Sequence, residues 1–515
     1  MKIIEKFNDR INGFLSGFDR MIIKGHIQQF YSQSGKQHFL NSNNIMYKDF
    51  GSYANKVTET LKNHVKELTE KENREYIYLN SPKISKQDTA LKQLKDNPIE
   101  SGLICTIATV ELCSTLQVIK NYKTQKLELG NANRKCTYFY FYILDPEFGL
   151  MHIKLQSWFP FMVQVYMNGR EYLARQLDKE GIKYERYDNS FTYIENLEKA
   201  QELADKMESV KLTGRLDAIV SKLNPYLSVI RDTFGMVYYW CVDQCEYATD
   251  IMFNSRKDLE EIYPSLVEHA LVNFKCEDVM TFLGRKMHHA FQGEIVSDIK
   301  KRPQGVRIKH RMKSNSIKMY DKYSVLRIET TIKKPTEFKI YKKIETDNGP
   351  QMRWVSMGKT IANIYRYAQV SAASNKRYLD ALADAVPTGE IISEIEKITQ
   401  RKKKNNKFQS GFNVLSPETC QMFSVIMDGA HTINGFTNKD ICAKLFPTQF
   451  KEKRYRNKVT RLLSKLRAHG LIRKAPRSRK YFVSSKGYRI MGGILYLKTK
   501  EYPSYVLKQT EKTPA

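Results

Sequence analysis

The clearest hydrophobic pattern begins at Gly102, where short apolar runs rich in β-branched and aromatic residues follow one another. The segments GLICTIATVELC (102–113), KCTYFYFYILD (135–145) and GLMHIKLQSWFPFMVQVYM (149–167) have the length and composition of strands. The sequence DPEFG (145–149) carries the Asp, Pro and Gly of a turn. We therefore predict a β-hairpin at this turn, whereas residues 1–100 are expected to be mixed helix and loop.

Residues 169–232 change to a helical pattern, in which apolar residues recur every three or four positions. Further helices are predicted over 236–253, 259–274 and 365–386. The core face of the helix predicted over 236–253 consists of Val237, Cys241, Cys245, Ala248 and Met252.

The segment KHRMKSNSIKMYDKYSVLRIETT (309–331) predicts a basic β-hairpin. Near its end, Leu326 and Ile328 alternate with Arg327 and Glu329, so one face is expected in the core and the other is charged. Two interpretations of the charged face stay open: a structural ion pair, or a face that holds a nucleic-acid backbone. On the second, the contacting residues are Lys309, Arg311, Lys313, Lys318 and Arg327.

Residues 412–500 carry a series of helix signals. Ser416 precedes Pro417 as an expected N-cap, and Thr437 with Asp440 resembles a capping box. In KEKRYRNKVTRLLSKLRAHG (451–470), an apolar stripe is formed by Val459, Leu462, Leu463 and Leu466, and a separate basic face by Arg454, Lys458, Arg461 and Lys465. Gly470 stands where a left-handed C-terminal cap is expected.

Three helices, the third of them basic, are followed by LIRKA, a turn PRSR and KYFVSS, and then by a last helix. This order resembles the winged-helix domains of bacterial DNA-binding regulators. The resemblance implies that the third helix enters the major groove of double-stranded DNA. It also implies that the wing, tipped by Arg477 and Arg479, touches phosphates or the minor groove. A winged helix used for protein contacts, or a merely solvated basic helix, is the alternative.

The charge of the chain changes the functional picture. Its 85 Lys and Arg against 55 Asp and Glu give a net charge of +30, which favours a polyanionic partner, DNA or RNA first. No apolar run reaches the ~18–20 residues that span a bilayer, and the charged N-terminus is unlike a signal peptide. Eight scattered cysteines without a CxxC pair are expected to be buried free thiols in a reducing cytoplasm.

Carboxylates supply the candidate chemistry. Asp243, Glu246 and Asp250 follow i, i+3, i+7 on one face of the helix predicted over 236–253, where they can hold Mg²⁺ or Mn²⁺. Asp145, at a strand end, and Glu329 are candidate partners, so the predicted catalytic group is Asp145, Glu246, Asp250 and Glu329. The alternative is a solvated stripe, or pairing with the basic hairpin.

Two other motifs are weaker. Gly358-Lys359-Thr360 lacks the Gly that a phosphate-binding loop needs at position 353, where this chain has Arg353. His288 and His289 are adjacent, unlike the spaced metal-binding pair of rolling-circle nickases. The large region does resemble a group of uncharacterised bacterial proteins of similar length that share YFYFYILDPEFGL and EYATDIMF, and this resemblance implies no activity.

The fold class predicted from these patterns is α+β, a multi-domain chain with a mixed α/β basic core and a C-terminal winged helix. The expected ranges are an N-terminal region (1–100), a basic core (101–345), a helical extension (346–399), a linker or phosphate-contacting arm (400–411), the winged helix (412–500) and a tail (501–515). The expected function is DNA binding in the service of a mobile element or its replication, with metal-dependent strand cleavage. The alternative is a non-catalytic regulator or an adaptor that binds RNA; single-stranded DNA at the core is a further possibility.

Overall fold

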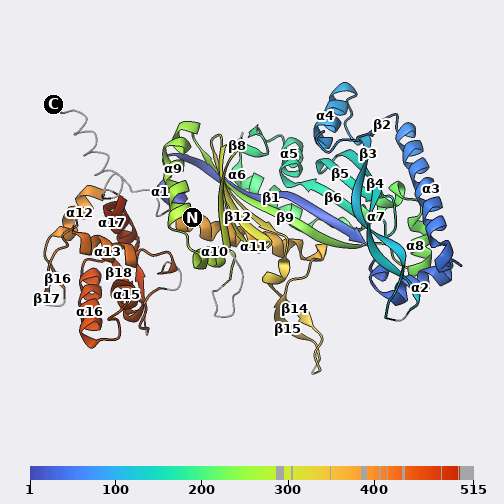
Figure 1. The fold of residues 1–515 in the computed structure, drawn as a ribbon. Coiled ribbons are helices and arrows are strands. Elements are labelled where there is room, and N and C mark those ends of the chain that lie inside the picture. Colours follow the sequence, from blue (N-terminus) through green and yellow to red (C-terminus); the bar gives the residue numbers. More distant parts are fainter. Residues whose placement is uncertain are drawn as a thin grey trace, which may run out of the picture. The chain divides into compact units, whose positions relative to one another are not determined.

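The computed structural model contains helices and strands throughout, including one large mixed sheet, as expected for the α+β class (Figure 1). It describes residues 1–123, 125–285, 295–302, 305–347, 349–383, 391–404, 407–414, 416–431, 435–476, 478–496 and 498. The chain forms two compact units. Unit 1 comprises Met1–Gly13, Ile251–Ile328 and Ala373–Ala515, and unit 2 comprises Phe14–Asp250 and Glu329–Ala372.

The largest sheet has the strand order β10-β11-β12-β13-β9-β1-β6-β5-β4-β3-β2. β2 pairs with β3 in parallel, whereas β3–β4, β4–β5, β5–β6 and β1–β6 are antiparallel pairs. The boundary between the two units falls within β1, β9 and β13.

Unit 2 holds most of the long strands and the helices that pack on them. Its strands are β1 (Ile11–His26), β2 (Glu75–Tyr78), β3 (Gly102–Lys120), β4 (Leu127–Asp145), β5 (Gly149–Gln156), β6 (Val163–Asn168), β7 (Tyr184–Tyr187), β8 (Ser190–Ile194), β9 (Tyr239–Phe253), β13 (Val325–Ile332), β14 (Lys339–Ile344) and β15 (Gln351–Ser356). Its helices are α2 (Gln33–Ser42), α3 (Phe50–Lys71), α4 (Lys86–Asp96), α5 (Gly169–Lys179), α6 (Leu197–Lys206), α7 (Leu212–Leu223), α8 (Leu227–Phe234) and the first part of α11 (Ile364–Leu382).

Unit 1 is assembled from three separate stretches of chain. Its further elements are α1 (Lys2–Lys6), α9 (Arg256–Val272), α10 (Cys276–Phe282), β10 (Ile295–Arg302), β11 (Gly305–Met312), β12 (Asn315–Lys322), α12 (Ile391–Thr399), β16 (Lys402–Lys404), β17 (Lys407–Gln409), α13 (Pro417–Ile426), α15 (Asn438–Leu445), α16 (Lys453–Ala468), β18 (Ile472–Lys474), β19 (Tyr481–Val483) and α17 (Ser485–Tyr496). The N-terminal stretch is tied to α11, because Lys2 donates its backbone N–H to Asp380 over 2.9 Å and Lys6 donates to the carbonyl of Ala383 over 2.6 Å. Ile3 is fully buried in the core of this unit.

Several predicted elements are confirmed. β4 and β5 form the expected hairpin, with Asp145 opposite Gly149. The helix predicted after Asn168 is α5, and Asn168 caps it by accepting from the N–H groups of Arg170 and Glu171. Ser416 and Thr437 cap α13 and α15 as predicted, and Gly470 has a left-handed φ of 75° after α16.

The helix predicted over 236–253 is wrong, because this segment is β9. Almost every residue of β9 is buried, so its apolar positions do not alternate with polar ones as they do in a half-exposed strand. A continuous apolar run of this kind also satisfies a helical spacing. The i, i+3, i+7 spacing of its carboxylates therefore does not define one face.

The expectation of helix and loop alone in residues 1–100 is also wrong, because this range contains the central strand β1. The helical prediction for residues 169–232 is wrong where β7 and β8 form an antiparallel hairpin. Strand β10 and the antiparallel hairpin β14–β15 were also not predicted. The linker range 400–411 contains the short hairpin β16–β17. That hairpin is followed by two contacts to α16: His469 with the carbonyl of Ser410 at 3.1 Å, and Lys465 with that of Gly411 at 2.9 Å.

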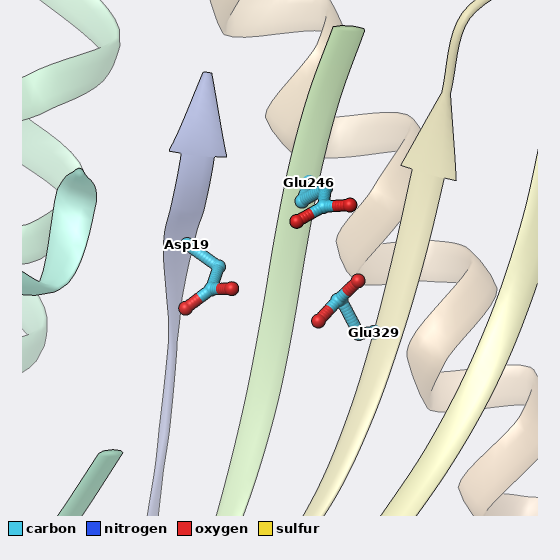
Figure 2. Close-up of side chains that lie close together, drawn as sticks. All are labelled: Asp19, Glu246 and Glu329. Atoms are coloured by element: carbon cyan, nitrogen blue, oxygen red, sulfur yellow. The ribbon is translucent and has the colours of Figure 1, made fainter. Parts of the chain in front are cut away.

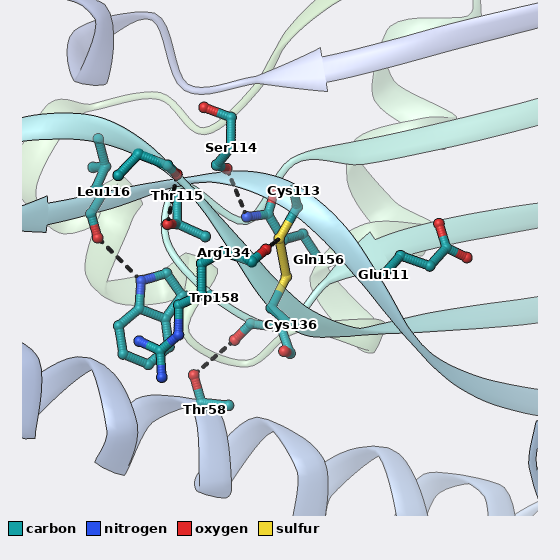
Figure 3. Close-up of a disulfide and its surroundings, with 12 residues drawn as sticks. Thr58, Glu111, Cys113, Ser114, Thr115, Leu116, Arg134, Cys136, Gln156 and Trp158 are labelled. Carbon is teal, nitrogen blue, oxygen red and sulfur yellow. Dashed lines mark hydrogen bonds between the residues drawn. A yellow bond between two sulfur atoms is a disulfide. The ribbon is translucent and has the colours of Figure 1, made fainter. Parts of the chain in front are cut away.

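The aromatic cluster that follows β5 is part of the core. Trp158, Phe159 and Phe161 are at most 4% exposed, so they do not stack on a ligand at the surface. The indole of Trp158 donates to the carbonyl of Leu116 over 3.1 Å, and the guanidinium of Arg134 lies 4.0 Å from its ring centroid (Figure 3). These contacts tie the chain after β5 to the β3–β4 ribbon.

Cys113 of β3 and Cys136 of β4 form a disulfide in the same region (Figure 3). The prediction that all eight cysteines are free thiols is therefore wrong for this pair. The register places Cys113 opposite Arg134 and Cys136 opposite Glu111, so the two cysteines are diagonal neighbours across the pair although they are 23 residues apart. Cys105, Cys241, Cys245, Cys276, Cys420 and Cys442 are free.

Among the described residues, no helix has the length and the apolar character needed to cross a membrane.

Candidate functional site

Three carboxylates from three neighbouring strands lie together in unit 2 (Figure 2). Asp19 is on β1, Glu246 on β9 and Glu329 on β13, and one oxygen of each lies within 4.8 Å of the others. These strands are adjacent in the order β13-β9-β1, which brings together residues far apart in the sequence. The three side chains, which we call the carboxylate triad, are 2%, 7% and 3% exposed, respectively.

Neutral donors orient the carboxylate triad. Asn189 donates to Asp19 over 2.6 Å, and Gln244 donates to Glu246 over 3.0 Å. Asn189 is itself held by the amide of Asn168, at 2.8 Å, the residue that caps α5. Because amides carry no charge, these bonds fix the carboxylates without neutralising them.

Arg20 is a cation next to the carboxylate triad. Its Nε lies 3.8 Å from a carboxylate oxygen of Asp19, and its side chain is about half exposed. Burial alone lowers the pKa of Arg20, but the attraction of Asp19 and then of Tyr166, Glu246 and Glu329 outweighs it and raises the pKa above the usual value. The guanidinium therefore experiences the negative field of all three carboxylates.

The donor set of the carboxylate triad suits a hard divalent cation. Figure 2 shows the three carboxylate groups gathered about β9, with Asp19 on one side of this strand and Glu329 on the other. Carboxylate oxygens are the ligands that Mg²⁺ and Mn²⁺ prefer. Three like charges in a buried site repel one another and must be offset by a bound cation, by protons or by basic neighbours.

Asp145 lies elsewhere, so the prediction that it joins Glu246 and Glu329 is wrong. Both of its oxygens accept from Arg215 at 2.6 Å, and one also accepts from the backbone N–H groups of Glu147 and Phe148 at the β4–β5 turn. Arg215 also contacts Glu147. These partners give Asp145 a structural role at the hairpin.

Asp243 and Asp250 are not members of the carboxylate triad either. Asp243 pairs with Lys24 at 2.9 Å and with Lys359 at 3.6 Å. Asp250 is fully buried and pairs at 3.0 Å with Arg170, which is 1% exposed. The predicted metal group of Asp243, Glu246 and Asp250 is therefore divided among three different sets of partners.

The predicted basic hairpin consists of β11, β12 and β13, and its cations differ in exposure. Arg311 and Lys313 are exposed, and Lys309, which lies opposite Lys318 on β12, is half-buried. Lys318 and Arg327 are only 8% and 1% exposed, so these two side chains do not form a surface for a nucleic-acid backbone. Their strands are covered on both faces, which the alternating pattern of charge did not indicate.

The C-terminal part of the chain contains α13, α15, α16, the antiparallel pair β18–β19 and α17, in that order. Val459, Leu463 and Leu466 of α16 are buried in a core that it shares with the other elements, and Leu462 packs at the edge. The predicted apolar stripe is confirmed. Four cations were predicted on the other face, and three of them are exposed: Arg454, Lys458 and Arg461.

Lys465 differs from the other three predicted cations of α16. It donates to the carbonyl of Gly411, lies 4.2 Å from the ring centroid of Phe412, and its pKa is lowered by burial. It therefore packs against its own domain. Arg479, between β18 and β19, is exposed as a wing residue would be, whereas Arg477, like His288 and His289, lies outside the described residues.

Asp19 is the member of the carboxylate triad that the sequence reasoning missed. The available signal was an acidic residue flanked by apolar positions in GFLSGFDRMIIKG (13–25). An Asp in an otherwise apolar strand is costly to bury without a partner. Recognising β1 as a strand would have made Asp19 a candidate.

Comparison with known proteins gives no relative. No protein-family model, no curated protein and no solved structure matches this chain. The winged-helix resemblance and the resemblance to bacterial proteins of similar length thus stay predictions.

Proposed function

We propose that this chain is a DNA-binding protein that contacts duplex DNA through α16 and the β18–β19 hairpin. The observation that carries the proposal is the exposed basic face of α16, with Arg454, Lys458 and Arg461, in a three-helix, hairpin and helix order. A helix of this kind enters a major groove with its long cations on base edges and phosphates. The net charge of +30 supports a polyanionic partner.

Arg461→Ala in the full chain is expected to weaken binding to a selected duplex site by about 5- to 150-fold, the effect of ~1–3 kcal/mol from a lost guanine contact. Discrimination at one base pair should fall with it, whereas loss of a phosphate contact would weaken all sequences equally. Fluorescence anisotropy with a randomised-and-selected duplex measures both.

The matched control for that experiment is Arg467→Ala. Arg467 is also exposed on α16 but lies away from the basic face, so affinity should stay unchanged. Equal losses of affinity in the two variants would show that only the net charge of the protein matters. Absence of duplex binding at low salt would contradict the proposal. In that case the non-catalytic adaptor, with RNA or a protein as partner, becomes the better explanation.

A second candidate function, metal-dependent strand cleavage, is favoured by the carboxylate triad. Carboxylates from separate strands that hold Mg²⁺ or Mn²⁺ are a common means of polarising a phosphate and activating water. Asp19, Glu246 and Glu329 would hold the ion, and Arg20 would offer its guanidinium to a phosphate oxygen. Incubating the purified chain with supercoiled plasmid and Mg²⁺ or Mn²⁺ tests this by the appearance of nicked circles.

Two expectations stay predictions: a role in a mobile element or its replication, and a location in the cytoplasm.

A further inference from the structure

The β14–β15 hairpin of unit 2 has an unusual surface for a structural ribbon. Its register places Tyr341 directly opposite Trp354, with ring centroids 5.4 Å apart. These two rings are 49% and 59% exposed, and Met352 on the same face is 51% exposed. The hairpin is visible in Figure 1 as the β14–β15 pair.

The base of the hairpin is anchored, so the exposed rings belong to an ordered ribbon. Ile340 is 3% exposed and Met357 is fully buried, and the backbone N–H of Met357 donates to the carbonyl of Phe338 over 2.9 Å. Arg366 of α11 lies 5.3 Å from the ring centroid of Trp354 and donates to the carbonyl of Lys339 over 2.9 Å. The indole is thus oriented by a cation that is itself fixed.

The two strands of the ribbon carry charge of one sign, whereas the turn between them contains Glu345 and Asp347. The strands KIYKKI and QMRWVS contain four cations and no acidic residue: Lys339, Lys342, Lys343 and Arg353. Lys342 and Arg353 are direct cross-strand partners, an arrangement that destabilises an isolated ribbon. Because successive residues alternate faces, this pair lies on the face opposite Tyr341 and Trp354. On the aromatic face, the exposed rings lie beside Lys339 and Lys343, and an anionic partner with flat rings fits both.

We propose that the β14–β15 hairpin binds an unpaired nucleic-acid strand, with bases stacked on Tyr341 and Trp354 and phosphates beside Lys339 and Lys343. Charge complementarity selects the polyanion, and the aromatic pair selects unpaired bases, because base faces are hidden in a duplex. Lys339, Tyr341 and Lys343 alternate along β14 on one face, which interleaves cations with the stacking ring. The inference rests on the proposed binding of nucleic acid but concerns a different surface from α16.

Tryptophan fluorescence gives a direct test. The chain has three Trp residues, of which Trp158 and Trp240 are 4% and 3% exposed, so Trp354 is the one open to a ligand. Titrating the full chain with oligo(dT) of about 16 nucleotides, within the usual site size, should quench its emission. Trp354→Phe should lose the quenching yet keep most of the affinity measured by anisotropy, since Phe still stacks.

The double variant Tyr341→Ala/Trp354→Ala should weaken oligo(dT) binding. Loss of one stacked base weakens binding by about 5- to 150-fold, and removal of both rings should cost at least that much. Tyr122→Ala is the matched control, because Tyr122 is 85% exposed at the β3–β4 turn and lies outside the hairpin. Unchanged melting temperatures show that the variants fold.

Three outcomes would overturn the inference: no quenching by oligo(dT), equal quenching by duplex, or equal displacement by poly-glutamate. These results are separate from the test of α16. If Arg461-dependent duplex binding persists while Trp354 is not quenched, the hairpin inference fails and the proposed function stands. If Trp354 is quenched while Arg461→Ala has no effect on duplex binding, the hairpin inference stands and the proposed role of α16 fails.

Discussion

Glu246→Gln is expected to reduce metal-dependent strand cleavage by at least about a hundredfold, the usual loss when one group that stabilises developing charge is removed. The amide keeps the volume of the side chain and can still accept the hydrogen bond from Gln244, so the protein should fold. It removes one negative charge and one strong ligand from the carboxylate triad. Plasmid nicking in Mn²⁺ measures the rate, and duplex affinity measured by anisotropy should not change.

The same variant separates a metal site from a structural cluster by its thermal response. In the parent protein, a metal concentration of 100 times Kd should stabilise the folded state by ~2.7 kcal/mol, and this increment should disappear in Glu246→Gln. Asp243→Asn is the matched control, because Asp243 is a carboxylate of the same strand that pairs with Lys24 and Lys359 instead. A parent that does not respond to Mn²⁺, or an equal loss in the control, would contradict the metal site.

Arg170→Met is expected to lower the free energy of unfolding by ~3–5 kcal/mol. Arg170 and Asp250 are almost fully buried and lie 3.0 Å apart, so the substitution leaves a buried carboxylate without its cation. Urea unfolding followed by tryptophan emission reports on this loss, because Trp158, Trp240 and Trp354 all lie in unit 2.

The comparison for Arg170→Met is Lys62→Ala, also in unit 2, which removes an exposed helical pair with Glu59 and should cost about 0.5 kcal/mol or less. Adding Asp250→Asn to Arg170→Met should recover part of the stability, because the buried charge that has lost Arg170 is removed as well. A loss no larger than that of Lys62→Ala would show that the buried pair is not important for stability.

Local signals predicted local structure well. The turn at Asp145–Gly149 and the caps at Ser416 and Thr437 depend on residues within a few positions of one another. The strand β9 was not predicted because both of its faces are buried, so the two-residue period that identifies a strand is absent. The strand β1 was not predicted because Gly and charged residues interrupt its apolar run.

The candidate site was predicted only in part. Glu246 was selected from a helical spacing that the strand β9 does not have, and Glu329 as the acidic residue on the charged face of the hairpin. These two carboxylates do lie together. Asp145 and Asp250 were assigned to the same group because their partners, Arg215 and Arg170, lie about 70 to 80 positions away. A long-range ion pair leaves no periodic trace in the sequence, so only the fold distinguishes it from a ligand set.

The assembly of unit 1 from three stretches of chain has a consequence for synthesis on the ribosome. The first thirteen residues emerge first, yet Lys2 and Lys6 bond to Asp380 and Ala383, which are made far later. In the nascent chain, Ile3 therefore lacks its partners in the core of unit 1 while the whole of unit 2 is translated. Domains ordinarily fold as they emerge, N-terminal first, but unit 1 cannot be completed until the residues after Ala372 have been synthesised.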